Sequence, residues 1–284
     1  MALTIKTNMS SLLVQQNLNN ATVSLNNAMR KLTTGYKINT ASDNAAGLSI
    51  ANNWVTQLGS IDIASENASM GNDMLSTAES SYGVITSHLQ RIRDLTEQAA
   101  NGTYGSQSLL AITAEITSRL DEISRISQNA NYNGINLMED KTADIRLQVG
   151  IKNNPNSAIY LSKDLFAKAT ATALVGGSSS ADFTANWTTV PASTIAAKLD
   201  VVDAAINNIS ARVTSIGAAQ NRVQSASSDL TIQNTNITSS LSTIRDTDVA
   251  QVSSEYIQAQ ILQQASATLL ATANQSPSVA LNLL

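Results

Sequence analysis

The feature that most constrains this chain is a heptad pattern that runs without interruption from Leu199 to Ile244. Its positions recur at alternating intervals of three and four residues, which places them along one stripe of an α-helix. A continuous helix of this span is about 70 Å long at 1.5 Å per residue, so no single compact domain covers it. The stripe comprises Leu199, Val202, Ile206, Ile209, Val213, Ile216, Gln220, Val223, Ser227, Leu230, Asn234, Ile237, Leu241 and Ile244.

Three positions of this stripe are polar and recur seven residues apart. They are Gln220, Ser227 and Asn234. Because a polar side chain in a heptad stripe weakens apolar packing, we expect this part of the stripe to pack less tightly or to face another subunit.

A second heptad stripe lies near the start of the chain. Gly35 follows it and offers a helix stop, while Ser42 and Asp43 supply capping oxygens for a helix that begins near Asn44. Residues 1–42 contain basic side chains and no acid, whereas acids alone follow Arg245, so we expect the two chain ends to lie side by side. The stripe comprises Val14, Leu18, Ala21, Leu25, Ala28 and Leu32.

Three more helices are predicted from apolar periodicity. One begins near Asn44 and runs to about residue 100, with an apolar stripe from Trp54 onward and a break in register near Gly71, and another covers residues 109–130. Turns at Asn101-Gly102 and Asn133-Gly134 bound the second of these helices. The third, over residues 249–273, is apolar on several sides and must be buried by the N-terminal helix, by neighbouring subunits, or by both. Its large side chains include Ile261, Leu262 and Leu269, and Pro277 is expected to end it.

The period changes from about 3.5 to 2 in the middle of the chain. Residues 143–150 and 158–165 alternate apolar and polar side chains, which predicts short strands joined in hairpins around residues 153–156. Residues 166–191 are small and polar, with GGSSS at 176–180, and are interpreted as a linker. The predicted fold class is therefore mainly α, a long-helix coiled-coil rod or bundle with a small β-hairpin region.

Composition argues against a chemical site. The chain has one His and no Cys, so we predict no catalytic, cofactor-binding or metal-binding residues. His88 is interpreted as a solvated helix residue, and the Asp121-Glu122 and Asp246/Asp248 acids fall on predicted helix surfaces or ends. Thinly spread Lys and Arg argue against nucleic acid. No apolar run reaches membrane-spanning length, so no membrane insertion is expected.

Both ends of the chain resemble bacterial flagellins. The resemblance leaves out only about residues 166–195. It is carried by NLN at 17–19, KLTTGYKIN at 31–39, DNAAGLSIA at 43–51, LQRIRDL at 89–95, AEITSRL at 114–120, AQNRV at 219–223, IRDTDVA at 244–250 and QILQQA at 260–265.

This resemblance implies a structural subunit that self-polymerises into the flagellar filament for swimming motility. Residues 1–42 and 245–284 would form an inner terminal coiled coil. Residues 43–165 and 192–244 would form a helical bundle with β-hairpins, and a short variable linker at 166–191 would stand where larger flagellins carry outer domains. The implied route is the flagellar type III export channel. The implied partners are other copies of the chain, a secretion chaperone at the C-terminal helix, and the filament cap and hook-filament junction proteins.

The resemblance also implies recognition of the monomer by Toll-like receptor 5. In similar flagellins this receptor uses an Arg, a Leu and a Glu that correspond here to Arg91, Leu95 and Glu115. At about 100° per residue, Arg91 points away from the apolar stripe and Leu95 lies at its border, so both are expected on an accessible face. Two alternatives to the filament subunit stay open, a junction or cap-like adaptor and an enzyme on a helical scaffold.

Overall fold

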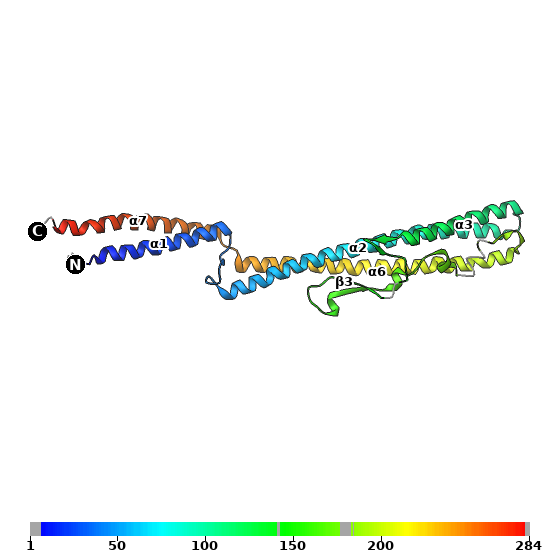
Figure 1. Ribbon diagram of the computed structural model, residues 1–284, viewed down its shortest axis with the longest axis horizontal. Helices are drawn as coiled ribbons and strands as arrows, with labels where there is room; N and C mark the ends of the chain where they lie inside the picture. Colours follow the sequence, from blue (N-terminus) through cyan, green and yellow to red (C-terminus); the bar gives the residue numbers. More distant parts are fainter. Residues whose placement is uncertain (1–6, 141–142, 177–182, 184, 282–284) are drawn as a thin grey trace. The chain divides into compact units, whose positions relative to one another are not determined.

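A computed structural model describes residues 7–140, 143–176, 183 and 185–281. The described chain is mainly helical with two small antiparallel sheets, which confirms the predicted fold class. It divides into two compact units, one within Met1–Gly59 and Thr235–Leu284 and the other within Ser60–Asn234. The long helices are α1 (Met9–Thr34), α2 (Ala45–Ala100), α3 (Ser106–Asn129), α6 (Ala192–Arg245) and α7 (Val249–Leu281), labelled in Figure 1.

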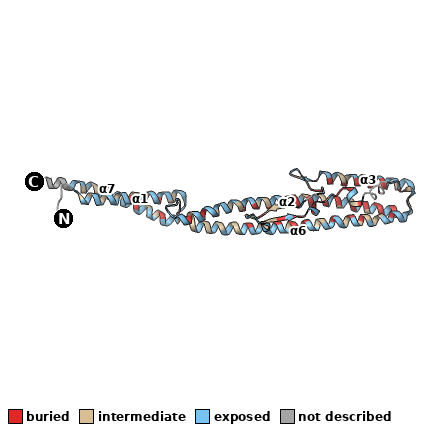
Figure 2. Cartoon of the chain, turned by 60° about the horizontal axis from the view of Figure 1, so that its bottom comes forward, coloured by how far each residue is buried: buried red, intermediate tan, exposed pale blue. Residues whose placement is uncertain are grey.

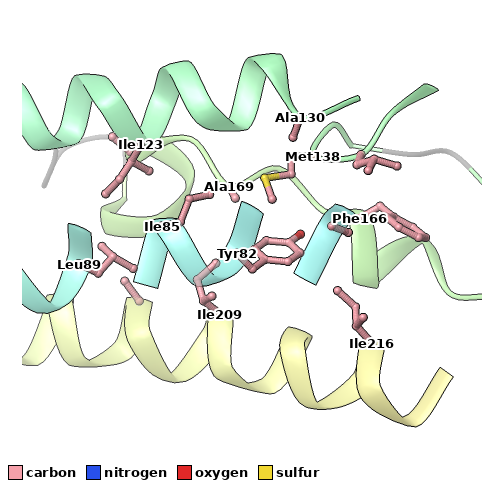
Figure 3. Packing of buried hydrophobic residues seen from close by; sticks show 14 of the residues in the cluster. Tyr82, Ile85, Leu89, Ile123, Ala130, Met138, Phe166, Ala169, Ile209 and Ile216 are labelled. Atoms are coloured by element: carbon pink, nitrogen blue, oxygen red, sulfur yellow. The ribbon is translucent and has the colours of Figure 1, made fainter. Parts of the chain in front are cut away.

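The core of the second unit lies where α2 packs against α3 and α6. Within this unit α2 and α6 run side by side in both views (Figures 1 and 2), and α3 lies along α2. Figure 3 shows Ile209 and Ile216 of α6 directed toward Tyr82 and Ile85 of α2. Because two helices cover α2, its buried arc is wider than a single stripe. The buried stripe of α2 contains Ile61, Ala64, Ala68, Gly71, Leu75, Ala78, Tyr82, Ile85, Leu89 and Ile92.

The long stripe predicted on α6 faces inward throughout. Every second member in its apolar part is fully buried, including Val202, Ile209 and Ile216, and the members between them are half-buried. The polar members also turn toward α2, since Gln220 Nε2 donates to Glu79 Oε2 at 2.9 Å and Asn234 Nδ2 donates to Asp62 Oδ1 at 2.9 Å. These two positions therefore make cross-helix hydrogen bonds within the chain.

Gly71 shows that the predicted break in the α2 register is wrong. It occupies the expected heptad position between Ala68 and Leu75, and it is buried. A Cβ at Gly71 would lie 2.3 Å from Leu147 Cδ2, so the side chain of Leu147 fills the space that a larger residue would take. The stripe continues without a slip, and its missing side chain is supplied by another part of the chain.

Leu147 belongs to the second of two β-hairpins. Strands β3 (Ile145–Gln148) and β4 (Ala158–Leu161) pair antiparallel, with Leu147 opposite Ile159, as the alternating sequence predicts. The other pair, β1 (Asn131–Tyr132) and β2 (Ile135–Asn136), surrounds Asn133 and Gly134 at φ 48° and 79°. Positive φ at both central residues is typical of a tight hairpin turn. The Asn133-Gly134 pair therefore forms the turn of a β-hairpin, in addition to marking the end of the region that contains α3.

The segment interpreted as a linker is packed wherever the structure describes it. It contains the end of η2 (Lys163–Phe166), α4 (Ala171–Val175) and η3 (Trp187–Thr189). Phe183 and Trp187 are fully buried, with ring centroids 6.0 Å apart, and Lys198 Nζ lies 5.2 Å from the Phe183 centroid. The composition of the segment does not reveal this packing, because a few large buried side chains hold in place a segment made mostly of small residues. Residues 177–180 of the GGSSS run lie outside the described residues.

Tyr82 fixes the start of this segment against α2. Its buried hydroxyl donates to the carbonyls of Leu165 at 3.0 Å and Ala167 at 3.2 Å. Arg212 Nη1 donates to the Ala167 carbonyl at 2.7 Å, so two helices hold one backbone carbonyl. Burial raises the pKa of the Tyr82 hydroxyl, which keeps it a hydrogen-bond donor.

The Gly71 contact yields a test of this packing. Gly71→Ala is expected to lower the free energy of unfolding by about 1–3 kcal/mol, because overpacking against Leu147 outweighs a helix-propensity gain of about 1 kcal/mol. In a Leu147→Ala background the same substitution should be neutral or stabilising. Urea unfolding of the four proteins gives the coupling energy.

Gly83 is the matched control, since it is exposed on α2 and no atom lies within 4 Å of its added Cβ. Gly83→Ala should stabilise by up to about 1 kcal/mol. An equal effect of Gly71→Ala with and without Leu147 would contradict the contact.

Candidate assembly and recognition surface

The first unit is built on the pairing of α1 with α7. The predicted α1 stripe faces α7, with Ala21 and Ala28 buried and its larger members half-buried. The stripe by which α7 faces α1 keeps the heptad alternation but consists largely of small or polar residues, which sequence inspection missed because larger apolar residues surround it. It comprises Val252, Tyr256, Ala259, Gln263, Ser266, Leu270 and Ala273.

Several large aliphatic side chains of α7 lie outside the stripe that faces α1. Ile261 is 60% exposed, Leu269 is 56% exposed and Leu262 is 50% exposed. Leu12 and Leu13 of α1 are exposed as well. Figure 2 shows few buried residues along the two helices. The three predicted assembly residues of α7 are thus largely exposed on its surface.

A groove runs along one side of the α1/α7 pair. Its volume is about 710 Å³, and α7 contributes Leu262 and Leu269 to its wall. The α1 side is mostly polar, with Asn17, Asn20 and Asn27 among its residues. A partner helix placed in this groove would meet Leu262 and Leu269 beside polar side chains on the α7 wall, and amide groups along the α1 wall.

Asn8 joins the ends of α1 and α7. Its Oδ1 accepts from Ser11 N at 3.1 Å and so caps α1, while its Nδ2 donates to the Ala273 carbonyl at 2.7 Å. The expectation that Pro277 ends the last helix is wrong, because α7 continues to Leu281. Since proline lacks an N–H, the carbonyl four residues earlier loses its helical donor. That carbonyl belongs to Ala273, and Asn8 replaces the missing donor.

The two helix breaks of this unit are bonded to each other. Tyr36 and Asp246 form an antiparallel bridge, and Thr247 N donates to the Gly35 carbonyl at 2.9 Å. Gly35 has φ 73° and ends α1 as predicted. The Arg245 guanidinium carbon lies 4.0 Å from the centroid of the Tyr36 ring. The α1–α2 and α6–α7 connections therefore form one structure.

The helix caps differ in part from those predicted. The oxygen that caps α2 comes from Asn44, which accepts from Gly47 N at 2.9 Å, whereas Asp43 accepts from the backbone N–H groups of Asn39 and Thr40. The hydrogen bonds from the backbone N–H groups of Thr40, which has the largest effect, and Asn39 lower the pKa of the Asp43 carboxyl. Asp248 caps α7 by accepting from two backbone N–H groups, which explains its place at a helix start.

Opposite charges do not pair α1 with α7, since no ion pair joins them within the described residues.

Arg91 and Glu115 meet across α2 and α3. Arg91 Nε lies 3.1 Å from Glu115 Oε1, and the Arg91 side chain is 49% exposed. Arg119 also binds this carboxylate, at 2.9 Å, and the two guanidiniums, Arg119 first, lower the pKa of Glu115. Sequence reasoning omitted Arg119, although its spacing of four from Glu115 is a signal for such a pair.

The predicted exposure of Leu95 is wrong. Only 2% of Leu95 is exposed, and it belongs to the central apolar cluster. The reason is the wide buried arc of α2, on which Leu95 and its neighbour Thr96 are both covered. Of the three residues assigned to a recognition surface, Arg91 and Glu115 lie together on the outside and Leu95 lies beneath.

No cluster of three potential metal-ligating side chains occurs among the residues that the structure describes. His88 is half-buried, with Nδ1 3.5 Å from Arg119 Nη1, and is not fully solvated as expected. In the same part of the chain, no helix combines the length and the apolar character needed to cross a membrane.

Comparison with known proteins agrees with this architecture at both ends of the chain. Residues 5–143 match the bacterial flagellin N-terminal helical region, and residues 199–284 match the bacterial flagellin C-terminal helical region. Flagellin of Listeria innocua serovar 6a is 31% identical over 284 residues, which cover 99% of each chain. The chain belongs to the flagellin family. The flagellar filament 33 kDa core protein of Treponema phagedenis is 30% identical over 290 residues, again covering 99% of each chain.

A solved structure shares the fold. It is described as a flagellar hook-associated protein from Vibrio parahaemolyticus, with a TM-score of 0.58 at 15% identity, and the match covers 71% of this chain and 99% of that chain. At this identity the likeness concerns the arrangement of helices alone. Membership of the flagellin family rests on the matches along the sequence.

The Asn8 contact predicts a specific cross-link. Ser11 Oγ lies 2.8 Å from Asn274 Oδ1, and the chain has no cysteine of its own. Ser11→Cys with Asn274→Cys should therefore form an intramolecular disulfide under mild oxidation. Adding Asn8→Asp should lower the yield, since the carboxylate still caps α1 but no longer donates to Ala273.

Leu12→Cys with Asn274→Cys is the control pair, since Leu12 is 56% exposed and lies outside the α1 stripe that faces α7. Equal cross-linking of both pairs, or an unchanged yield in the Asn8→Asp variant, would contradict the assignment.

Proposed function

We propose that this chain is the structural subunit of a bacterial flagellar filament and polymerises with itself for swimming motility. The observation that carries the proposal is the exposed aliphatic surface of α7, together with membership of the flagellin family. Helix α7 turns a stripe rich in small and polar residues toward α1 and keeps Ile261, Leu262 and Leu269 largely exposed. Such a surface is typical of a protein whose burial is completed by other copies.

The inner coiled coil of the filament is assigned to residues 1–42 and 245–284, in accord with the close α1/α7 pairing. Residues 43–165 and 192–244 form the surrounding bundle in this proposal, with the packed segment 166–191 in place of larger outer domains. The buried stripes of α2 and α6 hold the bundle, while the outer faces of α1 and α7 contact neighbouring copies. Catalysis has no part in this function.

Export and assembly partners follow from the same proposal. The chain leaves the cell through the flagellar type III export channel, with a secretion chaperone on the apolar face of the C-terminal helix. That face is needed later for assembly, so a chaperone would cover it until export. The filament cap and hook-filament junction proteins contact the same terminal helices.

Recognition of the monomer by Toll-like receptor 5 is proposed at the α2–α3 surface. Arg91 and Glu115 form an exposed charged pair there, and Arg is among the residues that dominate binding interfaces. Leu95 lies beneath this surface and would act by supporting α2 instead of touching the receptor. In this proposal the α2–α3 surface also contacts a neighbouring copy in the filament, so polymerisation would hide it.

Polymerisation can be tested at the outer face of α7. Ile261→Asp is expected to abolish filaments, because each interface would bury an unpaired charge at a cost of several kcal/mol. The second unit should unfold at the same urea concentration as in the unchanged chain. Gln264→Asp, an exposed polar position nearby, is the control and should still polymerise.

Negative-stain microscopy and sedimentation distinguish the alternatives. Long filaments support the proposal, whereas short closed rings would favour a junction or cap-like adaptor. Unchanged polymerisation of Ile261→Asp would show that this face of α7 is not an interface.

Receptor recognition is tested with depolymerised protein on Toll-like receptor 5 reporter cells. Arg91→Ala should weaken the response strongly, with a loss of at least about 2 kcal/mol in binding. Arg222→Ala, an exposed arginine on α6, should respond like the unchanged chain. A silent unchanged monomer, or an Arg91→Ala variant of full potency, would remove the receptor assignment and leave the filament proposal intact.

A further inference from the structure

The chain contains two Asn-Gly dipeptides, and the structure places them in different surroundings. One is Asn101-Gly102 in the connection between α2 and α3, and the other is Asn133-Gly134 in the β1–β2 turn. Asn-Gly is the dipeptide most prone to spontaneous deamidation in a flexible chain, because glycine has no side chain to shield its backbone nitrogen. Folding therefore decides which of the two can react.

Asn101-Gly102 has an open geometry that favours ring closure. Asn101, Gly102 and Thr103 are all exposed, and no atom lies within 4 Å of a Cβ placed on Gly102. Thr103 N donates to Asn101 Oδ1 at 3.3 Å. This bond keeps the side-chain carbonyl close to the backbone that follows Asn101 and draws electron density from the carbonyl carbon.

The flanks of this connection are held while its centre stays open. Gln98 Nε2 donates to the Tyr104 hydroxyl at 2.8 Å, and Tyr104 packs against the central apolar cluster. The backbone N–H of Gly102 makes no hydrogen bond within the described chain. No hydrogen bond to the Gly102 nitrogen therefore has to be broken before this nitrogen attacks the side chain of Asn101.

Asn133-Gly134 is held in a conformation that opposes the reaction. Asn133 has φ 48°, in the left-handed region, and the strands on either side of it are paired. Leu137 N donates to the Ala130 carbonyl at 2.8 Å, and both of these residues are buried. Ring closure needs the Asn backbone to leave the positive ψ of this region, which would open the hairpin.

We propose that Asn101 is a site of spontaneous deamidation in the folded protein and that Asn133 is protected. The Gly102 nitrogen loses its proton to water or hydroxide and attacks Asn101 Cγ. The Cγ–Nδ2 bond breaks, ammonia leaves, and a five-membered succinimide remains. Water then opens either carbonyl of the ring, which gives aspartate or isoaspartate. The net change is the gain of one water and the loss of one ammonia, with no oxidant or reductant.

The product changes the charge and the geometry of the α2–α3 connection. Its carboxylate lies at the C-terminal end of α2, where the helix dipole disfavours negative charge. The isoaspartate form also adds a methylene to the main chain between two helices. The connection between α2, which carries Arg91, and α3, which carries Glu115, is therefore expected to loosen as the protein ages. It should also become more sensitive to protease.

Peptide mass spectrometry of full-length protein incubated at mildly alkaline pH tests the proposal. Conversion at Asn101 is expected to be about tenfold faster than at Asn133, equivalent to a barrier lower by about 1.4 kcal/mol. Incubation in H₂¹⁸O should place the heavy oxygen in the Asn101 product. Equal rates at the two sites, or a faster rate at Asn133, would overturn the proposal.

Two controls separate the fold from the local sequence. In guanidinium the two rates should converge, and a tenfold difference that persists in the unfolded chain would show that structure is not the cause. Gly102→Ala should slow the reaction by shielding the nitrogen, and its added Cβ meets no neighbour, so the fold should be kept. Undiminished conversion in that variant would also contradict the mechanism.

Discussion

The structure depends on the burial of α2. Its stripe is too long to be buried by any short element, so α6 runs along it and α3 covers a second side within the Ser60–Asn234 unit. Alanine and glycine along the stripe leave space between the helices, and other parts of the chain fill it. Leu147 enters at Gly71, while Tyr82 reaches out to hold the carbonyls of the following segment. Packing density is thus reached by inserting loops and hairpins between long helices.

Polar contacts add register to this apolar packing. An apolar stripe pairs almost equally well after a shift of seven residues, whereas a hydrogen bond between two particular side chains does not. Gln220 with Glu79 and Asn234 with Asp62 each fix α6 against α2 in this way. Asn8 has the same role in the α1/α7 pair, because only Ala273 has a carbonyl freed by a proline four residues later.

Periodicity predicts which residues of a helix are apolar, but not which neighbour covers them. It located the long helices, the inward stripe of α6 and the β3–β4 hairpin. It failed where one helix has two partners, as at Leu95, and where a missing side chain is replaced from elsewhere, as at Gly71. At the proposed recognition surface, helix geometry placed Arg91 correctly, and only the structure showed its bond to Glu115. The linker interpretation was wrong because it weighed the many small and polar residues of the segment above its few large ones, and Phe183 and Trp187 are fully buried.

Pairing with α1 leaves much of the apolar surface of α7 exposed to solvent, because the two faces of α7 carry different side chains. The inward face consists mainly of side chains such as Ala259 and Ser266, which bring the helices close but remove little apolar area from water. The outward face keeps Ile261 and Leu269 exposed, and each would contribute roughly 1.5–3 kcal/mol if fully buried. A helix that needed only α1 would carry these side chains on the other face. We infer that the outward, more apolar surface of α7 contacts other copies of the chain. The inward, less apolar surface fixes the position of α7 against α1, and so sets the geometry in which the outward surface is presented to those copies.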